Sequence, residues 1–122
     1  MQRRRTGSKA EAFAADFLRK QGCSIIERNV RYPFGEIDIV ALQKETVVFV
    51  EVRSSRGGDL IRPSESIGAK KIERLTRAAF RFLQEHPVLQ KSPVRFDCII
   101  ITDVNADPRI SWIKNAFEPA RL

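Results

Sequence analysis

The stretch GEIDIVALQKETVVFVEVRSSR, Gly35 to Arg56, decides the fold. Within it, Ile37–Leu42 and Thr46–Val52 are rich in β-branched and aliphatic residues, which favour strands. A polar segment centred on Lys44-Glu45 lies between them. The pattern therefore predicts an antiparallel hairpin that turns at Lys44-Glu45.

Two acids, Asp38 and Glu51, stand among the apolar residues of this hairpin. In the predicted register Leu42 pairs with Val47, and counting back along both strands places Asp38 directly opposite Glu51. Directly opposed residues have Cβ atoms roughly 4.5–5.5 Å apart, where like charges repel. We therefore expect a raised pKa on one carboxyl or a cation between the two. A slip of one residue would put the acids on opposite faces of the hairpin.

Composition indicates a single domain of 122 residues, long enough to form a core without disulfides. Cys23 and Cys98 each lie in an apolar run, which predicts buried free thiols in a reducing cytoplasm and makes a cysteine zinc site a poor interpretation. No apolar stretch approaches the roughly 20 residues that cross a bilayer. The net charge of +7 favours a polyanionic partner such as nucleic acid.

The rest of the chain alternates helical and strand patterns. We expect a basic arm over residues 1–6, a helix over Ser8–Gln21, a short strand over Ser24–Glu27 and a basic connection over Arg28–Phe34. After the hairpin we expect a loop over Ser54–Gly68, a helix over Ala69–Glu85, strands over Phe96–Thr102 and Ile110–Ile113, and a tail over residues 118–122. The order predicts an α/β domain, with one central sheet and helices packed on it.

Several short motifs along nearly the whole chain resemble the YraN family, small bacterial proteins related to Holliday-junction resolvases of the PD-(D/E)XK nuclease superfamily. They are Gly7-x-x-Ala10-Glu11, Arg28-Asn29, Gly35-Glu36-Ile37-Asp38, Phe49-Val50-Glu51-Val52-Arg53, Lys71, Arg95-Phe96-Asp97 and Asn115-Ala116-Phe117. The resemblance implies a restriction-endonuclease-like domain with an αβββαβ core, a mixed central sheet and flanking helices. It also implies a cytoplasmic nucleic-acid-binding protein, and resolvase-like relatives act as homodimers.

The same resemblance implies roles for individual residues. Asp38 and Glu51 match the metal-binding carboxylates, with the Val52 carbonyl as a further ligand, and Glu11 matches an acid beside the metal. The implied cofactor is Mg²⁺ or Mn²⁺, hard cations that prefer oxygen ligands. Arg53 stands where the superfamily has a lysine, and arginine stays protonated in proteins. Lys71 matches a basic position of the family and is the candidate to substitute for that lysine.

Other interpretations of these residues remain open. Ser8-x-x-Glu11 also fits a capping box, and Asp38 and Glu51 could form a salt-bridge network with Arg53 and Lys71. Glu36 is expected to pair across the hairpin with Arg53. We interpret Asp97 as structural, His86 as a helix C-terminal cap, and Trp112 and Tyr32 as packing residues that could alternatively stack on bases.

Basic residues cluster in a way that suits a nucleic-acid backbone. Lys70, Arg74, Arg77 and Arg81 fall on one helical stripe, where like charges repel unless an anion lies nearby. With Arg3, Arg4, Arg5, Lys9, Arg28, Arg31 and Arg56 they could line duplex or branched DNA. A solvated helix face is the plainer interpretation. Our first hypothesis is a metal-dependent, structure-selective DNA endonuclease, the second a non-catalytic nucleic-acid-binding module, and the third a protein-interaction domain.

Overall fold

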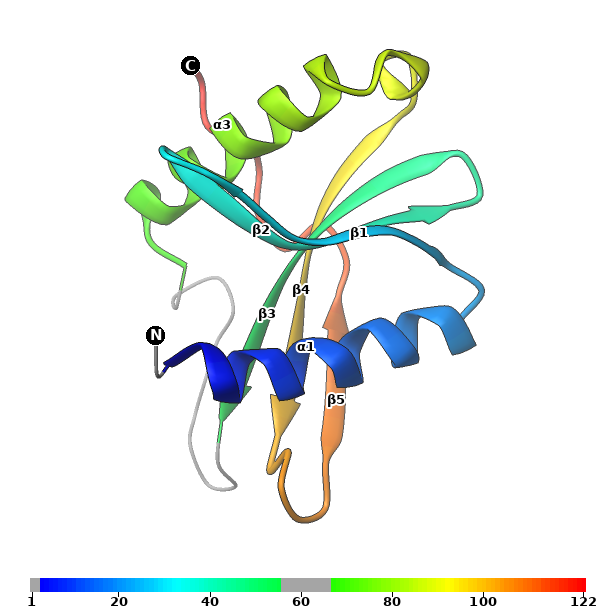
Figure 1. Cartoon of the computed structure of the whole chain (residues 1–122), viewed down its shortest axis with the longest axis vertical. Helices are drawn as coiled ribbons and strands as arrows, with labels where there is room; N and C mark the ends of the chain where they lie inside the picture. Colours follow the sequence, from blue (N-terminus) through cyan, green and yellow to red (C-terminus); the bar gives the residue numbers. More distant parts are fainter. Residues whose placement is uncertain (1–2, 56–66) are drawn as a thin grey trace.

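The computed structural model describes residues 3–55 and 67–122, and the side chains within them from residue 9 onward. The chain folds as a five-stranded sheet in the order β1-β2-β3-β4-β5 with helices packed on it (Figure 1). The elements are α1 Arg3–Lys20, β1 Ser24–Tyr32, β2 Gly35–Gln43, β3 Thr46–Ser55, α3 Ala69–Gln84, the 3-10 turn η1 Pro87–Leu89, β4 Val94–Thr102 and β5 Arg109–Ile113. Only β3 and β4 pair in parallel, so the sheet is mixed and the predicted α/β fold class is confirmed.

Several element boundaries differ from the sequence prediction. The basic segment Arg28–Phe34 was expected as a connection, but β1 runs on through Tyr32 and pairs with β2 along that length. The reason is that Val30 is a buried core residue facing Ile37, so the charged residues around it occupy the exposed positions of a strand. Most of the loop predicted over Ser54–Gly68 lies outside the described residues, and Ser54 and Ser55 belong to β3.

The first helix begins earlier than its pattern indicated. Residues 3–6, predicted as part of a basic arm, form the start of α1. Ser8 therefore lies inside the helix and is not its N-cap, which removes the capping-box interpretation of Glu11. The apolar spacing that signals a helix starts at Ala10, a buried core residue, whereas the preceding residues of the helix are mostly polar, so the pattern placed the start too late.

The two long helices cover opposite faces of the sheet (Figure 1). Ala10, Ala14 and Leu18 of α1 pack on one set of alternating strand residues, which includes Ile39, Val48, Val50, Ile99 and Ile101. Leu75, Ala79 and Phe82 of α3 pack on the other set, which includes Val40, Val47, Phe49 and Phe96. Because strand side chains alternate between faces, Asp38, Glu51 and Arg53 belong to the face that carries α3.

The turn between β1 and β2 lies directly against α3. A Cβ on Gly35 would clash with the carbonyl oxygen of Arg74 and lie 2.9 Å from its carbonyl carbon. Only a residue without a side chain permits this approach. Gly35 therefore fixes the distance between the turn and the helix, and with it the shape of the surface around Arg74.

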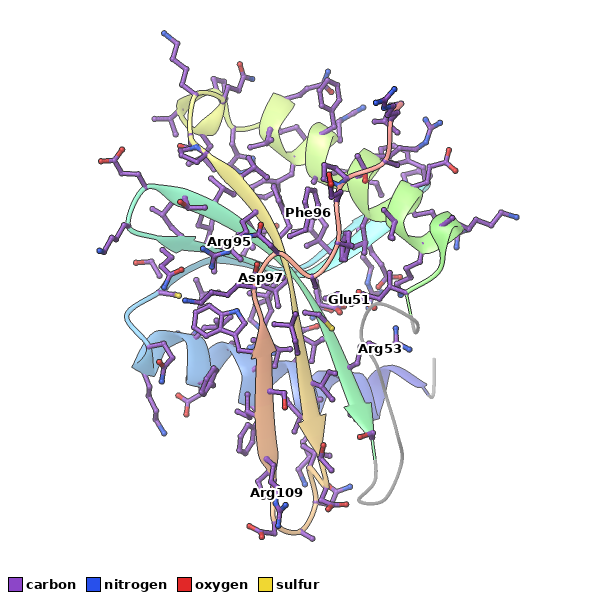
Figure 2. All side chains as sticks on the ribbon, turned by 180° about the vertical axis from the view of Figure 1, so that it is seen from behind. Glu51, Arg53, Arg95, Phe96, Asp97 and Arg109 are labelled. Carbon is purple, nitrogen blue, oxygen red and sulfur yellow. The ribbon has the colours of Figure 1, made fainter. Side chains whose placement is uncertain are left out.

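A buried carboxylate ties the C-terminal part of the chain to the sheet (Figure 2). Asp97 of β4 is fully buried and accepts hydrogen bonds from Arg95 Nε (2.9 Å), Trp112 Nε1 (2.9 Å) and the backbone N–H of Asn115 (3.0 Å). These bonds satisfy the charge that burial would otherwise penalise. The interpretation of Asp97 as a structural residue agrees with this network.

The structure also bears on the predictions for the two cysteines, His86 and the C-terminal tail. Cys23 and Cys98 are buried free thiols, as expected. His86 Nδ1 lies 2.7 Å from the carbonyl oxygen of Phe82 in the last turn of α3, which matches the predicted cap. The tail over residues 118–122 is irregular but attached, since the Ala120 N–H donates to Thr76 Oγ1 on α3.

Candidate functional site

The candidate site lies where β2 and β3 separate. Their pairing follows the predicted register, with Leu42 opposite Val47, as far as Ile39 opposite Val50. The ladder stops there, and the Asp38 carboxylate accepts the backbone N–H of Val52 through Oδ2 at 2.8 Å. The expected direct opposition of Asp38 and Glu51 is thus replaced by a side-chain bridge between the two strands.

Glu51 is the buried acid of the site, with a residue exposure of only 5%. Its Oε2 atom lies 3.1 Å from Lys71 Nζ and 3.8 Å from Arg53 NH1. Lys71 comes from the first turn of α3. Arg53 follows Glu51 by two residues on β3 (Figure 2). The contact with Lys71 joins residues that are distant in sequence and brings the ammonium to the buried carboxylate.

Burial, and after it the negative charge of nearby Asp38, raise the pKa of Glu51 to about 7, against the lowering effect of Lys71 and Arg53. The expectation of a raised pKa on one of the two carboxyls is consistent with this environment. The physical cause is that an anion in a poorly solvated position next to another anion is costly. A bound cation would reverse that cost, because it favours the ionised form of both acids.

The oxygens at this site suit a hard divalent cation. Asp38 and Glu51 supply carboxylates, and such donors, together with backbone carbonyls and water, are what Mg²⁺ and Mn²⁺ take. Within residues 3–55 and 67–122, no group of three or more His, Cys, Asp or Glu side chains gathers in a way that could hold a metal ion. In this part of the chain the site therefore offers one carboxylate pair, and the Val52 carbonyl as a further ligand stays a prediction.

Glu11 has partners of its own on β1. It is 2% exposed, and its Oε1 atom accepts hydrogen bonds from Arg28 Nε at 3.2 Å and Asn29 Nδ2 at 2.9 Å. Asn29 adopts a left-handed φ of 54°, a conformation that asparagine tolerates better than most residues. These bonds give Arg28 a structural partner, and a role for Glu11 beside a metal stays a prediction.

The predicted basic residues fall into several groups. Lys70, Arg74, Arg77 and Arg81 are all exposed on α3, and Arg31 is exposed on β1. Arg77 pairs with Glu73 and Arg81 with Glu85, each at 3.1 Å, so the repulsion expected along the stripe is relieved within the helix itself. Lys9 donates to Asn105. The side chains of Arg3, Arg4 and Arg5 and the whole of Arg56 lie outside the described part of the chain.

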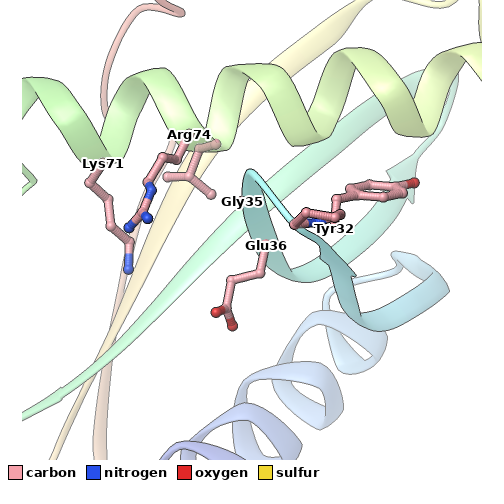
Figure 3. A pocket seen from close by; sticks show the side chains of 7 residues that line it. Tyr32, Gly35, Glu36, Lys71 and Arg74 are labelled. Carbon is pink, nitrogen blue, oxygen red and sulfur yellow. The ribbon is translucent and has the colours of Figure 1, made fainter.

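A cavity of about 270 Å³ adjoins the site and shares Lys71 with it (Figure 3). The Lys71 and Arg74 side chains extend from α3, and Glu36 comes from the start of β2, just after the β1–β2 turn. Glu36 pairs with Arg31 of β1 along one edge of β2, and the β2–β3 ladder ends at Ile39 opposite Val50, so the expected pairing of Glu36 with Arg53 stays a prediction. The cluster Pro33-Phe34-Gly35 predicts a turn at this position. No local sequence pattern, however, shows that this turn packs against α3 and so forms the cavity.

The remaining candidates are engaged in packing. Trp112 donates to Asp97 and meets Phe17 edge-on at 5.9 Å, which confirms its structural interpretation. Tyr32 donates to Glu85 at 2.7 Å, and its ring stacks on Phe34. Trp112 is half-buried, and Lys114 Nζ lies over its ring at 4.5 Å from the centroid. The stacked rings of Tyr32 and Phe34 lie at the rim of the α3 surface.

The fold and the site define a small α/β domain whose mixed sheet carries a buried carboxylate, Glu51, beside the half-buried Asp38, next to a basic helix. Residues 10–101 match the uncharacterised protein family UPF0102, the YraN family, and the chain belongs to it. It is 44% identical to a UPF0102 protein of Coxiella burnetii (strain RSA 331), over 92% of this chain and 91% of the relative. It is also 44% identical to a UPF0102 protein of Pseudomonas syringae pv. syringae (strain B728a), over 95% of both chains.

A third relative is a UPF0102 protein of Pseudomonas aeruginosa (strain LESB58), 43% identical over 92% of this chain and 91% of the relative. The match over nearly whole chains confirms the family resemblance drawn from the short motifs. In the described residues, none of the helices is both long and apolar enough to cross a membrane.

Proposed function

We propose that this protein is a metal-dependent, structure-selective DNA endonuclease that hydrolyses phosphodiester bonds at the Asp38–Glu51 pair. The observation that carries the proposal is the contact of Lys71 with Glu51 at 3.1 Å, beside a second carboxylate. Two acids and a lysine at one point are the elements of a PD-(D/E)XK site. Here the lysine comes from α3 and not from the strand.

In this proposal Asp38, Glu51 and the Val52 carbonyl would hold Mg²⁺ or Mn²⁺. When bound, such an ion supplies positive charge to the phosphate and lowers the pKa of a coordinated water. Asp38 is oriented for this role by the Val52 N–H, which fixes one of its oxygens. Glu51 must be ionised to serve as a ligand, and Lys71 supports that form by pairing with it.

Lys71 and Arg53 have different chemical capacities at this site. A lysine ammonium can orient an attacking water and can lose its proton when its pKa falls, whereas the guanidinium of Arg53 stays protonated. Arg53 is suited to hold a phosphate oxygen or to stabilise charge in the transition state. We therefore assign water positioning to Lys71 and phosphate contact to Arg53, with Glu11 assisting from α1.

The test is cleavage of labelled linear duplex, flap and four-way-junction DNA with and without Mg²⁺ or Mn²⁺. We expect cleavage that requires the divalent ion and is lost in Asp38→Asn and Glu51→Gln. Glu45→Gln is the matched control, because Glu45 is an exposed acid at the turn of the same hairpin. Manganese calorimetry supplies a second measurement, and an unchanged isotherm in Asp38→Asn would contradict the metal site.

A second candidate is a nucleic-acid-binding module that does not cleave. Two observations favour it: Arg53 replaces the motif lysine, and Lys71 already engages the carboxylate oxygen that a metal would use. For this module, DNA affinity falls linearly with the logarithm of salt concentration while all cleavage assays stay blank. Arg53→Lys separates the two candidates, because a gain of cleavage shows that arginine limits the chemistry.

A further inference from the structure

The outer surface of α3 carries aromatic as well as basic side chains. We call aromatic–basic surface the set Phe34, Lys71, Arg74, Arg77, Phe80 and Arg81. The β1–β2 turn divides it, because one cavity of about 270 Å³ lies between the turn and the first half of α3 and another of about 290 Å³ lies between Phe34 and the second half. The two hollows thus follow one another along the helix.

Phe80 is the clearest anomaly of this surface. Its exposed fraction is 59%, and it lies between Arg77 and Arg81 in the sequence of α3, on the side of the helix that the sheet does not cover. The core of α3 is formed by other residues, among them Leu75, Ala79 and Phe82. A single exposed phenylalanine is ordinary on a protein surface, but Phe80 shares a hollow with Phe34, Arg77 and Arg81. This grouping of aromatic and basic side chains is what indicates a binding role.

A second aromatic group stands across the same hollow. The rings of Tyr32 and Phe34 stack at 5.4 Å with an angle of 10° between their planes, and Phe34 lines the cavity together with Phe80. The hydrogen bond from Tyr32 to Glu85 holds the pair against α3. Gly35 keeps the whole turn in place through its close approach to Arg74. The aromatic wall is therefore fixed before any ligand arrives.

The charges of the surface suit a flexible anionic strand. Lys71 and Arg74 extend side by side from α3 into the first cavity (Figure 3). Arg77 and Arg81 border the second, and their ion pairs with Glu73 and Glu85 are about half exposed, so water already competes for them. From Lys71 to Arg81 the helix rises by about 15 Å, which leaves room for a few nucleotides.

We propose that the aromatic–basic surface binds a single-stranded segment of DNA. Bases in a duplex are stacked on each other, so an exposed aromatic ring in a hollow can stack only on an unpaired base, while the cations follow the phosphates. This inference rests on the proposed function in taking DNA as the ligand, and it names the substrate class: branched DNA with an unpaired strand next to the cleavage point. Lys71 links the strand to Glu51, because it belongs to both the surface and the site.

The test is fluorescence anisotropy of a labelled oligothymidine and of a blunt duplex of equal length, in EDTA so that no cleavage intervenes. We expect Phe80→Ala to weaken oligothymidine binding about fivefold or more, the lower end of the loss for a stacking aromatic, with duplex binding within about twofold. Phe13→Ala is the matched control, since Phe13 is an exposed phenylalanine on α1, across the sheet. Circular dichroism checks that each variant is folded.

A second pair of variants tests the charges. Arg74→Gln should weaken oligothymidine binding and reduce its salt dependence, whereas Arg109→Gln, on an exposed arginine of β5, should do neither. Equal losses for oligothymidine and duplex in Phe80→Ala, or no loss, would overturn the inference. So would concentration-dependent self-association that Phe80→Ala abolishes in a protein that binds no oligothymidine, because the surface would then be a protein interface.

These outcomes are independent of those for the proposed function. If no DNA is cleaved but oligothymidine binding depends on Phe80, the proposal of a single-strand-binding surface is supported and the enzyme proposal fails. If cleavage requires a divalent ion and Phe80→Ala changes neither DNA affinity nor substrate choice, the enzyme proposal is supported and the proposal of a single-strand-binding surface fails.

Discussion

The ammonium of Lys71 lies 3.1 Å from a carboxylate oxygen of Glu51, so an ion pair joins helix α3 to the buried end of the β2–β3 hairpin. Glu51 is 6% exposed at its side chain and Lys71 is 48% exposed. The ion pair thus joins a buried carboxylate, Glu51, to a solvated ammonium, Lys71. Its contribution to stability depends on whether Glu51 is ionised.

The first prediction concerns Lys71→Met. With Glu51 ionised, near pH 8, we expect the variant to lose about 1 kcal/mol of unfolding free energy, since a buried carboxylate loses a partner but Lys71 itself is solvated. Near pH 5 Glu51 is protonated, because its pKa is about 7, and the loss should be small. Urea unfolding at both pH values measures this difference.

Lys70→Met is the control, because Lys70 is the preceding lysine and is exposed on the same turn. It should cost little at either pH. An equal loss at pH 5 and pH 8 in Lys71→Met would mean that the side chain acts through packing and not through the charge of Glu51.

The second prediction concerns the pH dependence of stability. The pKa of Glu51 is raised from 4.5 to about 7, so the folded state binds more protons than the unfolded state between these values. Stability from this group is therefore full below pH 4.5 and is lost as pH rises through about 7. A shift of that size corresponds to at most about 3 kcal/mol. Glu51→Gln should lack this loss, and urea unfolding from pH 4 to pH 8 tests it.

Other groups titrate in the same range, so the informative quantity is the difference between wild type and variant. Glu45→Gln, which alters an exposed acid at the hairpin turn, should follow the wild-type curve. Parallel curves for wild type and Glu51→Gln would show that the carboxyl has an ordinary pKa.

Much of the sheet was predictable because its signals are local. The β-branched runs around Lys44-Glu45 predicted the β2–β3 register, and the apolar stripe from Ile72 to Leu83 predicted α3, since periodicity reports directly on which face is buried. The predicted β1 was too short because the strand has only one buried residue, so its charged and polar composition resembles that of a loop.

The site was only partly predictable. The hairpin register brought Asp38 near Glu51, but it could not show that pairing stops at Ile39 and that Asp38 turns to the Val52 N–H. The contact between Lys71 and Glu51 depends on how α3 lies on the sheet, which no local pattern contains. The same holds for the turn at Gly35, whose place against Arg74 creates the adjoining cavity.

The third prediction concerns that turn. Gly35→Ala would place a Cβ against the carbonyl group of Arg74, and backbone atoms cannot yield as a flexible side chain does. We expect a loss of about 1–3 kcal/mol, as for overpacking elsewhere in proteins, and weaker oligothymidine binding because the turn shifts. Gly68→Ala is the steric control, since a Cβ there meets nothing within 4 Å. Its own cost, from replacing glycine at the N-cap of α3, should be only about 0.5 kcal/mol. Similar stability of the two variants, measured in urea, would show that the turn does not depend on this approach.

The fourth prediction concerns the buried network of Asp97. Asp97→Ala leaves Arg95, whose side chain is only 16% exposed, without its carboxylate partner. We expect a loss of about 3–5 kcal/mol, the usual cost of removing one member of a buried pair. Asp107→Ala, at an exposed acid of the β4–β5 turn, should cost little. Thermal and urea unfolding measure both.

The double variant Asp97→Ala/Arg95→Met decides what the network contributes. If the destabilisation in Asp97→Ala comes from the unpaired guanidinium of Arg95, removing that guanidinium should restore part of the stability. The summed losses of unfolding free energy in the two single variants should then exceed the loss in the double variant. Additive losses would instead place the cost in the bonds from Trp112 and the Asn115 N–H, which remain broken in both variants. None of these hydrogen bonds of Asp97 goes to Asp38, Glu51 or Lys71, so variants that fold should keep the DNA affinity of the wild type. Unchanged affinity together with lower stability would identify Asp97 as a structural residue.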